Sequence, residues 1–197
     1  MGLKGFFIQY KFILPNEIKH SSYTYQKLFR ALYGYSQSVS KSSGKTYNYR
    51  RPGVLSKTPF IKQGKNCVVI QPDAFKELIS FFKTGKNPAH NWTTKGDWKA
   101  VYYLNEKDLE ESNVVSALEK WIDRTQLTSS SKEPMLLLEE MEKLKEEVSS
   151  GKKIDSAHHK AVLGEAQKIT GSVWFKSAYS KSPKLKQFNS IYSFLKG

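Results

Sequence analysis

The chain has 197 residues, of which 39% are hydrophobic and 13% aromatic, so it can bury a core and is not globally disordered. Its formal net charge is +14, from 32 Lys or Arg against 18 Asp or Glu. Enzymes that act on small molecules seldom carry such an excess, whereas proteins that bind phosphate polyanions use it for steering and affinity.

Cysteine usage and hydropathy bear on where the protein works. Cys67 is the only cysteine, which rules out an intrachain disulfide and favours a reducing, cytoplasmic location. The opening residues do not read as a secretory signal peptide, and no stretch approaches the ~18 apolar residues of a membrane span. We therefore expect no membrane partner.

The first elements in chain order are a strand and a helix. Residues 5–14 alternate in the manner of a buried strand, which ends at Pro15. Residues 22–33 place apolar side chains at helical spacing, after a serine suited to the N-cap position. Gly34 is the expected end of this helix.

Two hairpins are predicted next. Segments 35–39 and 45–50 alternate and are joined by a turn at 41–44, with hydroxyls, amides and cations expected on the outer face. Segments 58–62 and 66–70 form the second hairpin. A strand, a helix and a two-stranded ribbon can reach a nucleic-acid groove, but many folds contain this combination.

The remainder of the chain is predicted to form a helix, one further strand and then a series of helices. A helix is predicted from Pro72 to about residue 83, a strand over 98–104, and a helix over 106–124 capped by Asn105. In the strand, Trp98 and Tyr102 share one side, and Lys99 and Tyr103 share the other. Further helices are predicted over 135–148, from 155 or 156 to 170, and after Pro183, and residues 173–179 lie between the last two without a separate assignment.

These elements predict an α+β protein with a small, mostly antiparallel sheet and flanking helices, followed by a helical C-terminal region. We expect a mixed basic domain over 1–124, a linker over 125–134 and a helical region over 135–197. The serine run and Pro134 mark the linker, because they lack apolar anchors and interrupt a helix.

Positive charge is concentrated near the N-terminus. Residues 1–72 hold twelve Lys or Arg and one acid, and residues 19–71 hold ten cations, six tyrosines and no acid. Like charges on one segment repel each other unless a polyanion or an acidic face offsets them, and tyrosine rings can stack on bases. The pattern favours a nucleic-acid surface, and the alternative is a solvated basic face with ordinary core tyrosines.

Arg50 and Arg51 are the only adjacent arginines, and a guanidinium can fork onto a phosphate or a guanine edge. They are predicted to form a phosphate clamp, with a solvated surface pair as the alternative. Cations of the C-terminal tail are expected to contact phosphates. The candidate binding residues are Lys27, Arg30, Tyr35, Lys41, Lys45, Tyr47, Tyr49, Arg50, Arg51, Lys57, Lys62, Lys65, Lys176, Lys181, Lys184 and Lys186.

Catalytic and metal motifs are not recognisable. The turn 41–45 lacks the spacing of a phosphate-binding loop, and His158, His159 and Glu165 do not share a helical face that suits a metal. We expect no catalytic residue, metal or cofactor. The predicted function is non-catalytic binding of nucleic acid, with RNA or a ribonucleoprotein favoured by the tyrosines. A DNA-binding regulator or packaging protein, a metal-dependent nuclease and a protein-assembly subunit are the alternatives.

Overall fold

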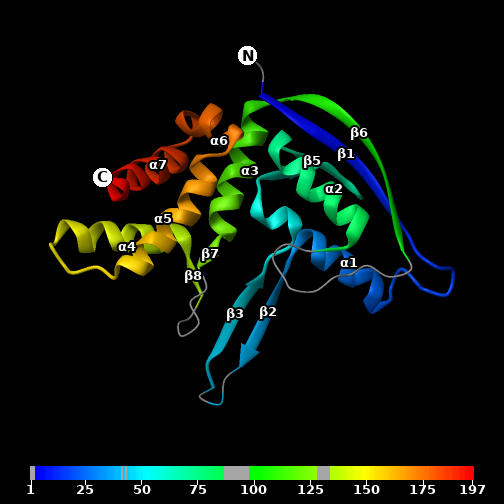
Figure 1. Ribbon diagram of the computed structural model, residues 1–197, viewed down its shortest axis with the longest axis horizontal. Helices are drawn as coiled ribbons and strands as arrows, with labels where there is room; N and C mark the ends of the chain where they lie inside the picture. The colour runs from blue at the N-terminus through cyan, green and yellow to red at the C-terminus, as the bar shows by residue number, and fades with distance from the viewer. Residues whose placement is uncertain (1–2, 41, 43, 87–97, 128–133) are drawn as a thin grey trace. The chain divides into compact units, whose positions relative to one another are not determined.

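The computed structural model describes residues 3–40, 42, 44–86, 98–127 and 134–197. It shows an α+β protein, as the sequence predicts, with a four-stranded antiparallel sheet, flanking helices and a helical C-terminal region. The chain divides into two compact units, residues 1–110 and 111–197 (Figure 1). Each unit has its own buried core.

The first unit is built on four antiparallel strands in the order β4-β5-β1-β6. The central strand β1 pairs with β5 on one side and with the edge strand β6 along its whole length on the other. The strands are β1 Leu3–Ile13, β4 Phe60–Lys62, β5 Cys67–Ile70 and β6 Lys99–Leu109.

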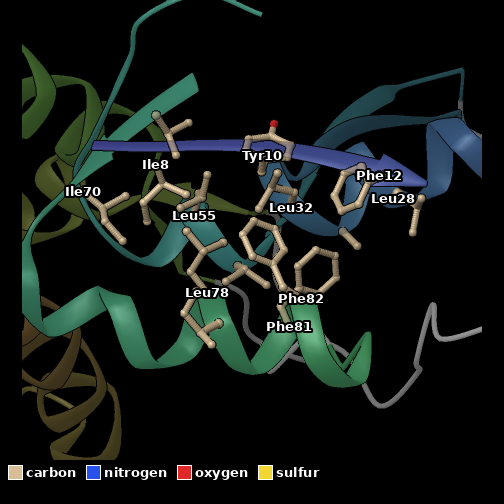
Figure 2. Packing of buried hydrophobic residues seen from close by; sticks show 14 of the residues in the cluster. Ile8, Tyr10, Phe12, Leu28, Leu32, Leu55, Ile70, Leu78, Phe81 and Phe82 are labelled. Carbon is tan, nitrogen blue, oxygen red and sulfur yellow. The ribbon is translucent and has the colours of Figure 1, made fainter. Parts of the chain in front are cut away.

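One face of this sheet forms the core of the first unit. Ile8, Tyr10 and Phe12 alternate along β1 and are almost fully buried. They pack against the helices α1 (Tyr23–Tyr33) and α2 (Phe75–Thr84), as Figure 2 shows for Phe81 and Phe82. Edge-to-face ring contacts within this cluster, such as Phe12 with Phe81 at 6.4 Å between centroids, add to the stabilisation from buried area.

Local signals explain where α1 begins and ends. The side chain of Ser22 accepts a hydrogen bond from the backbone N–H of Tyr25, and the N–H of Gly34 donates to the carbonyl of Arg30. Gly34 has φ +77°, a conformation that glycine adopts without the clash that other residues meet. The predicted bounds of this helix are therefore confirmed.

The first predicted hairpin is also confirmed. β2 (Tyr35–Ser40) and β3 (Thr46–Arg51) pair only with each other and form a separate two-stranded sheet among the described residues. The two strands, hereafter the ribbon, extend from the end of α1 (Figure 1). A short helical turn, η1 (Val54–Lys57), follows and inserts Val54 and Leu55 into the core.

The helix expected over 106–124 is wrong at its start. Residues 105–109 continue β6, and the helix α3 runs from Glu111 to Arg124. Two acids near the expected helix start, Glu106 and Asp108, belong instead to β6, where Glu106 forms an ion pair with Lys4 of β1, whereas Glu111 does lie in the first turn of α3. Pairing with a long neighbouring strand outweighs the local preference for a capped helix.

The second unit contains five α-helices among its described residues, the first of which is α3, together with a 3₁₀ turn at Tyr179–Lys181 and two short strands. The buried side of α3, with Leu118 and Trp121, packs against α4, α6 and α7. The N-terminal domain expected from the sequence extends to residue 124 and so includes this helix. Within the predicted linker, residues 126 and 127 form a short strand that pairs with the strand directly after the linker. The elements are β7 Gln126–Leu127, β8 Met135–Leu136, α4 Leu137–Ser149, α5 Ser156–Thr170, α6 Val173–Ala178 and α7 Pro183–Lys196.

Candidate nucleic-acid interface

The register of the ribbon sorts its side chains by chemistry. Residues directly opposite each other in an antiparallel pair point to the same face, and neighbours along a strand point to opposite faces. Tyr35 lies opposite Arg51, Gln37 opposite Tyr49, and Val39 opposite Tyr47. These six residues, hereafter the aromatic face, include all three tyrosines of the ribbon and one arginine.

Cations contact the rings of the aromatic face. The guanidinium carbon of Arg51 lies 6.0 Å from the ring centroid of Tyr49, and its Nε donates a hydrogen bond of 3.1 Å to Gln37. Arg30 of α1 lies 5.2 Å from the ring of Tyr35 and 5.6 Å from the ring of Tyr23. Each exposed cation–π contact is worth about 0.5–1 kcal/mol, so these pairs help to orient Arg51, which is exposed, and Arg30, which is half-buried.

The opposite face of the ribbon carries hydroxyls and an amide. Ser38 donates a 2.6 Å hydrogen bond to Asn48, and the hydroxyls of Ser40 and Thr46 are 3.0 Å apart. Arg50 lies on this second face, opposite Ser36. The ribbon therefore separates the two arginines that were expected to form one clamp, because adjacent residues of a strand project in opposite directions.

Two glycines hold the base of the ribbon against the end of α1. A Cβ added to Gly53 would lie 2.2 Å from the backbone nitrogen of Gly34, so only glycine permits this approach. The hydroxyl of Ser56 accepts a hydrogen bond from the N–H of Gly53 and donates one of 2.8 Å to the carbonyl of Tyr33. This contact ties the start of β2 and the end of β3 to one point of the first unit.

The other predicted cations of the first unit lie on several elements. Lys45 borders the ribbon turn, Lys57 ends η1, and Lys65 lies in the turn between β4 and β5; all three are exposed. Lys27 lies on α1 and is half-buried. Lys62 lies on β4, with its Nζ 5.3 Å from the ring of Tyr33. The prediction for Lys41 falls outside the described residues.

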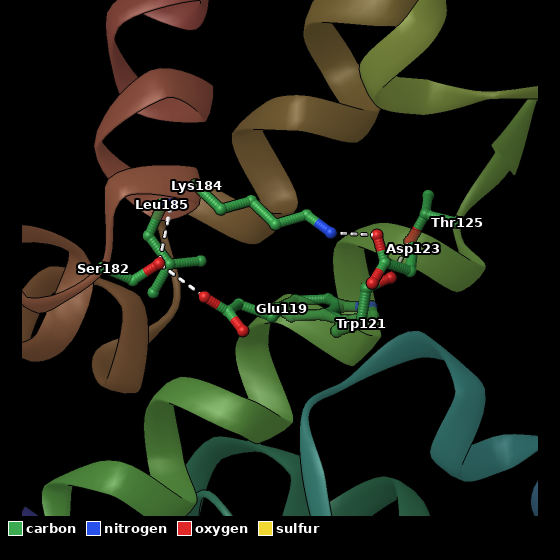
Figure 3. Close-up of polar contacts among 7 residues, drawn as sticks. All are labelled: Glu119, Trp121, Asp123, Thr125, Ser182, Lys184 and Leu185. Atoms are coloured by element: carbon green, nitrogen blue, oxygen red, sulfur yellow. Dashed lines mark hydrogen bonds and ion pairs between the residues drawn. The ribbon is translucent and has the colours of Figure 1, made fainter.

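Two of the four tail cations are engaged in ion pairs within the second unit. Lys184 pairs with Asp123 of α3, as Figure 3 shows, and Lys181 lies 3.2 Å from Glu111. In the same figure the hydroxyl of Ser182 donates to Glu119 and caps α7. These carboxylates offset the charge that Lys181 and Lys184 were expected to offer to phosphates. Lys176 and Lys186 are exposed.

The two adjacent histidines of α5 have protein partners. His158 Nε2 lies 2.7 Å from a carboxylate oxygen of Glu140, which is 4% exposed, and His159 Nε2 lies 3.1 Å from the carbonyl of Leu195. Among the described residues no three His, Cys, Asp or Glu side chains come together as metal ligands. Within the described segments, every helix is too short or too polar to cross a lipid bilayer.

Two residues in and around the ribbon, Tyr23 and Gln37, are not among the candidates predicted from the sequence. Tyr23 is 66% exposed and shares Arg30 with Tyr35. The sequence could have indicated this contact, because Tyr23 and Arg30 are seven residues apart and so lie on the same side of a helix, two turns from each other. Gln37, which binds Arg51, was also missed; only the strand register shows that contact.

Comparison with known proteins identifies no relative. No protein-family model, no curated protein and no solved structure matches the chain, so its function has to be inferred from its own residues.

Proposed function

We propose that this protein binds nucleic acid without cleaving it, and that the aromatic face of the ribbon is a principal contact. The observation that carries the proposal is the sorting of the ribbon by its register: three half-buried tyrosines and Arg51 share one face, and no residue of 35–51 is acidic. Arg30 adds a cation where the ribbon meets α1.

The chemistry of this face suits a phosphate polymer with accessible bases. Guanidinium groups bind phosphate through paired N–H donors, and tyrosine rings stack on unpaired bases with little regard to sequence. RNA is the preferred partner, because its loops and ends present unstacked bases to protein side chains. A cytoplasmic ribonucleoprotein is the corresponding setting.

The alternatives make different demands on the same surface. A DNA-binding regulator would insert the ribbon into a duplex groove, and an assembly subunit would set the cations against an acidic protein. A nuclease would require a catalytic centre in addition to the binding surface. These differences can be separated by measuring binding and cleavage with defined partners.

The test compares two arginine substitutions that change the net charge equally. Fluorescence anisotropy is measured for labelled single-stranded RNA, single-stranded DNA and duplex DNA over a range of salt concentrations. Arg51→Gln should weaken binding to single strands and lower the slope of log K against log salt by about 0.7 for each phosphate that the variant no longer binds. Arg50→Gln, on the opposite face, should leave the slope near that of the wild type.

Three results would contradict the proposal. Equal losses in both variants would indicate a diffuse charge effect, with no role for the aromatic face. Metal-dependent shortening of the labelled strands would indicate a nuclease. Tight, salt-sensitive binding to an acidic protein, with none to polynucleotides, would favour the assembly subunit.

A further inference from the structure

The face of the four-stranded sheet opposite α1 and α2 is chemically distinct from the core face. On β1 it consists of the residues that alternate with Ile8, Tyr10 and Phe12, and the register places them directly opposite residues of β6. Several are exposed: Tyr103 by 60%, Val101 by 50% and Ile13 by 46%. The pairs are Leu3 with Leu109, Gly5 with Lys107, Phe7 with Asn105, Gln9 with Tyr103, Lys11 with Val101, and Ile13 with Lys99. At one end of this face Gly5 is buried, as is Val69 of β5, which lies opposite Phe7.

Charge is segregated between the two sides of this strand pair. Lys11, Lys99 and Lys107 belong to the open face, and no described strand residue on that face is Asp or Glu. The two acids of β6, Glu106 and Asp108, alternate with Lys107 and belong to the other side, where Glu106 pairs with Lys4. The open face is therefore cationic although β6 as a whole is nearly neutral.

Rings and amides alternate across the centre of the open face. Gln9 lies beside Tyr103, and Phe7 lies beside Asn105, so two successive cross-strand pairs each contain one ring and one amide. Phe7 and Tyr103 are diagonal neighbours, at a separation of about 7–8 Å for such positions. Lys107 Nζ lies 6.0 Å from the ring of Phe7 and donates a hydrogen bond of 3.2 Å to Gln63.

We propose that this open face, comprising Phe7, Gln9, Lys11, Lys99, Tyr103, Asn105 and Lys107, is a second nucleic-acid site that takes an unpaired strand. The rings stack on successive bases, the amides bond base edges as donor and acceptor, and the lysines contact phosphates. A duplex does not fit this chemistry, because its bases are stacked on each other and are not open to the rings. The inference extends the proposed function to a surface that the ribbon does not include.

Charge decides between this occupant and a second copy of the chain. Stacking two such faces would oppose lysines with lysines in a protein of net charge +14, which is destabilising without counterions. A polyanion removes that repulsion and gains from it through counterion release. The exposed valine and isoleucine are single side chains at the rim of a cationic surface, which is ordinary for a protein surface.

The test uses the full chain and an oligouridine of about 16 nucleotides, the upper end of a single-domain site. Tyr103→Ala should weaken its binding by about fivefold or more, because one base stack is removed. Binding of duplex RNA should change by less than about twofold, since no stacked base reaches the ring. Ultraviolet crosslinking to a thiouridine-substituted strand should label peptides that contain Phe7 or Tyr103.

A matched pair of lysine variants isolates the charge contribution. Lys11→Gln with Lys99→Gln should lower the salt slope by about 1.4, for two contacts on a single strand. Lys76→Gln with Lys83→Gln, which removes the same charge from exposed positions of α2, should leave the slope unchanged. Circular dichroism and hydrogen exchange of β1 establish that each variant is folded.

The outcomes separate this inference from the proposed function. Normal binding by Tyr103→Ala, together with weakened binding by Arg51→Gln, would overturn the open-face site and retain the ribbon. No binding of any polynucleotide by the wild type would overturn both. A concentration-dependent dimer that Tyr103→Ala abolishes in sedimentation would assign the face to a second copy and overturn the inference.

Discussion

Because Gly53 packs closely against Gly34, we predict that Gly53→Ala strongly destabilises the first unit. An alanine Cβ at position 53 would lie 2.2 Å from the nitrogen of Gly34 and 2.7 Å from the carbonyl oxygen of Leu32. The shorter distance is about 1.2 Å below the 3.4 Å at which ordinary contact begins. All the opposing atoms are backbone, so no side chain can rotate away. Overpacking of this kind costs about 1–3 kcal/mol, and we expect the upper end.

Three other glycines calibrate the expectation. Gly34→Ala combines a φ of +77° with a 2.6 Å approach to the carbonyl oxygen of Arg51, so it should also destabilise the first unit strongly. Gly44 has φ +78° but nothing within 4 Å, so its alanine variant should lose only about 1 kcal/mol. Gly164 lies in α5 with open space around it, and Gly164→Ala should gain about 0.5–1 kcal/mol.

Hydrogen exchange followed by mass spectrometry can measure these changes separately in each unit. The slowest-exchanging amides of β1 report the opening free energy of the first unit, and those of α3 report the second. Gly53→Ala should accelerate exchange in β1 and leave α3 unchanged. A β1 opening energy within about 0.5 kcal/mol of the wild type, the range of a neutral surface change, would refute the close approach.

Two further predictions concern hydroxyl and carboxylate groups inside each unit. Burial raises the pKa of the Tyr10 phenol, which shares a 2.8 Å hydrogen bond with Tyr33, and burial also raises the pKa of Tyr33. Because the pKa of Tyr10 in the folded protein lies above the unfolded value of 10, its contribution to the free energy of unfolding is complete below pH 10 and declines above it. Tyr10→Phe should lower the free energy of unfolding by about 0.5–1.5 kcal/mol at neutral pH and make its decline at alkaline pH shallower, as measured by urea denaturation. A decline as steep as that of the wild type would refute this. In the second unit, His158→Ala removes the partner that lies 2.7 Å from the Glu140 carboxylate, and it should lower the opening free energy of α4 by about 1.5–3 kcal/mol. Lys143→Ala removes an exposed side chain whose Nζ lies 3.8 Å from the same carboxylate, and it should lower that energy by less than about 0.5 kcal/mol. Equal losses in the His158 and Lys143 variants would contradict the role of His158 as the main partner of Glu140.

Local patterns were sufficient for most elements of the fold. The cap at Ser22 and the glycine at position 34 bounded α1, and alternation located both hairpins. The sequence failed at residues 105–109, where acids near an asparagine suggested a helix start. What decides this segment is β1, about a hundred residues earlier, whose pairing extends from Leu3 to Ile13. Local preference contains no information about a partner so distant in the chain.

The sequence predicted most residues of the candidate site but not how they are arranged on the ribbon. Tyr35, Tyr47, Tyr49 and Arg51 were all named from the sequence, and the register brings them to one face. The pairing of Arg50 with Arg51 as one clamp did not follow, because neighbours in a strand diverge. The ion pairs of Lys181 and Lys184 join groups more than sixty residues apart, so charge counting along the tail could not reveal them.

The open face of the sheet and the ribbon both depend on the alternation of side chains along their strands. In both, the proposed contacts come from every second residue, so a one-residue deletion in β6 between Lys99 and Glu106 would bring Glu106 and Asp108 to the open face and move Lys107 to the other side. Conservative replacement at a given position changes one group, whereas such a deletion replaces one lysine of the open face with two acids, while Lys11 and Lys99 stay in place. Divergent relatives that retain this chemistry should therefore vary in side chains while keeping the spacing of β1 and β6 intact.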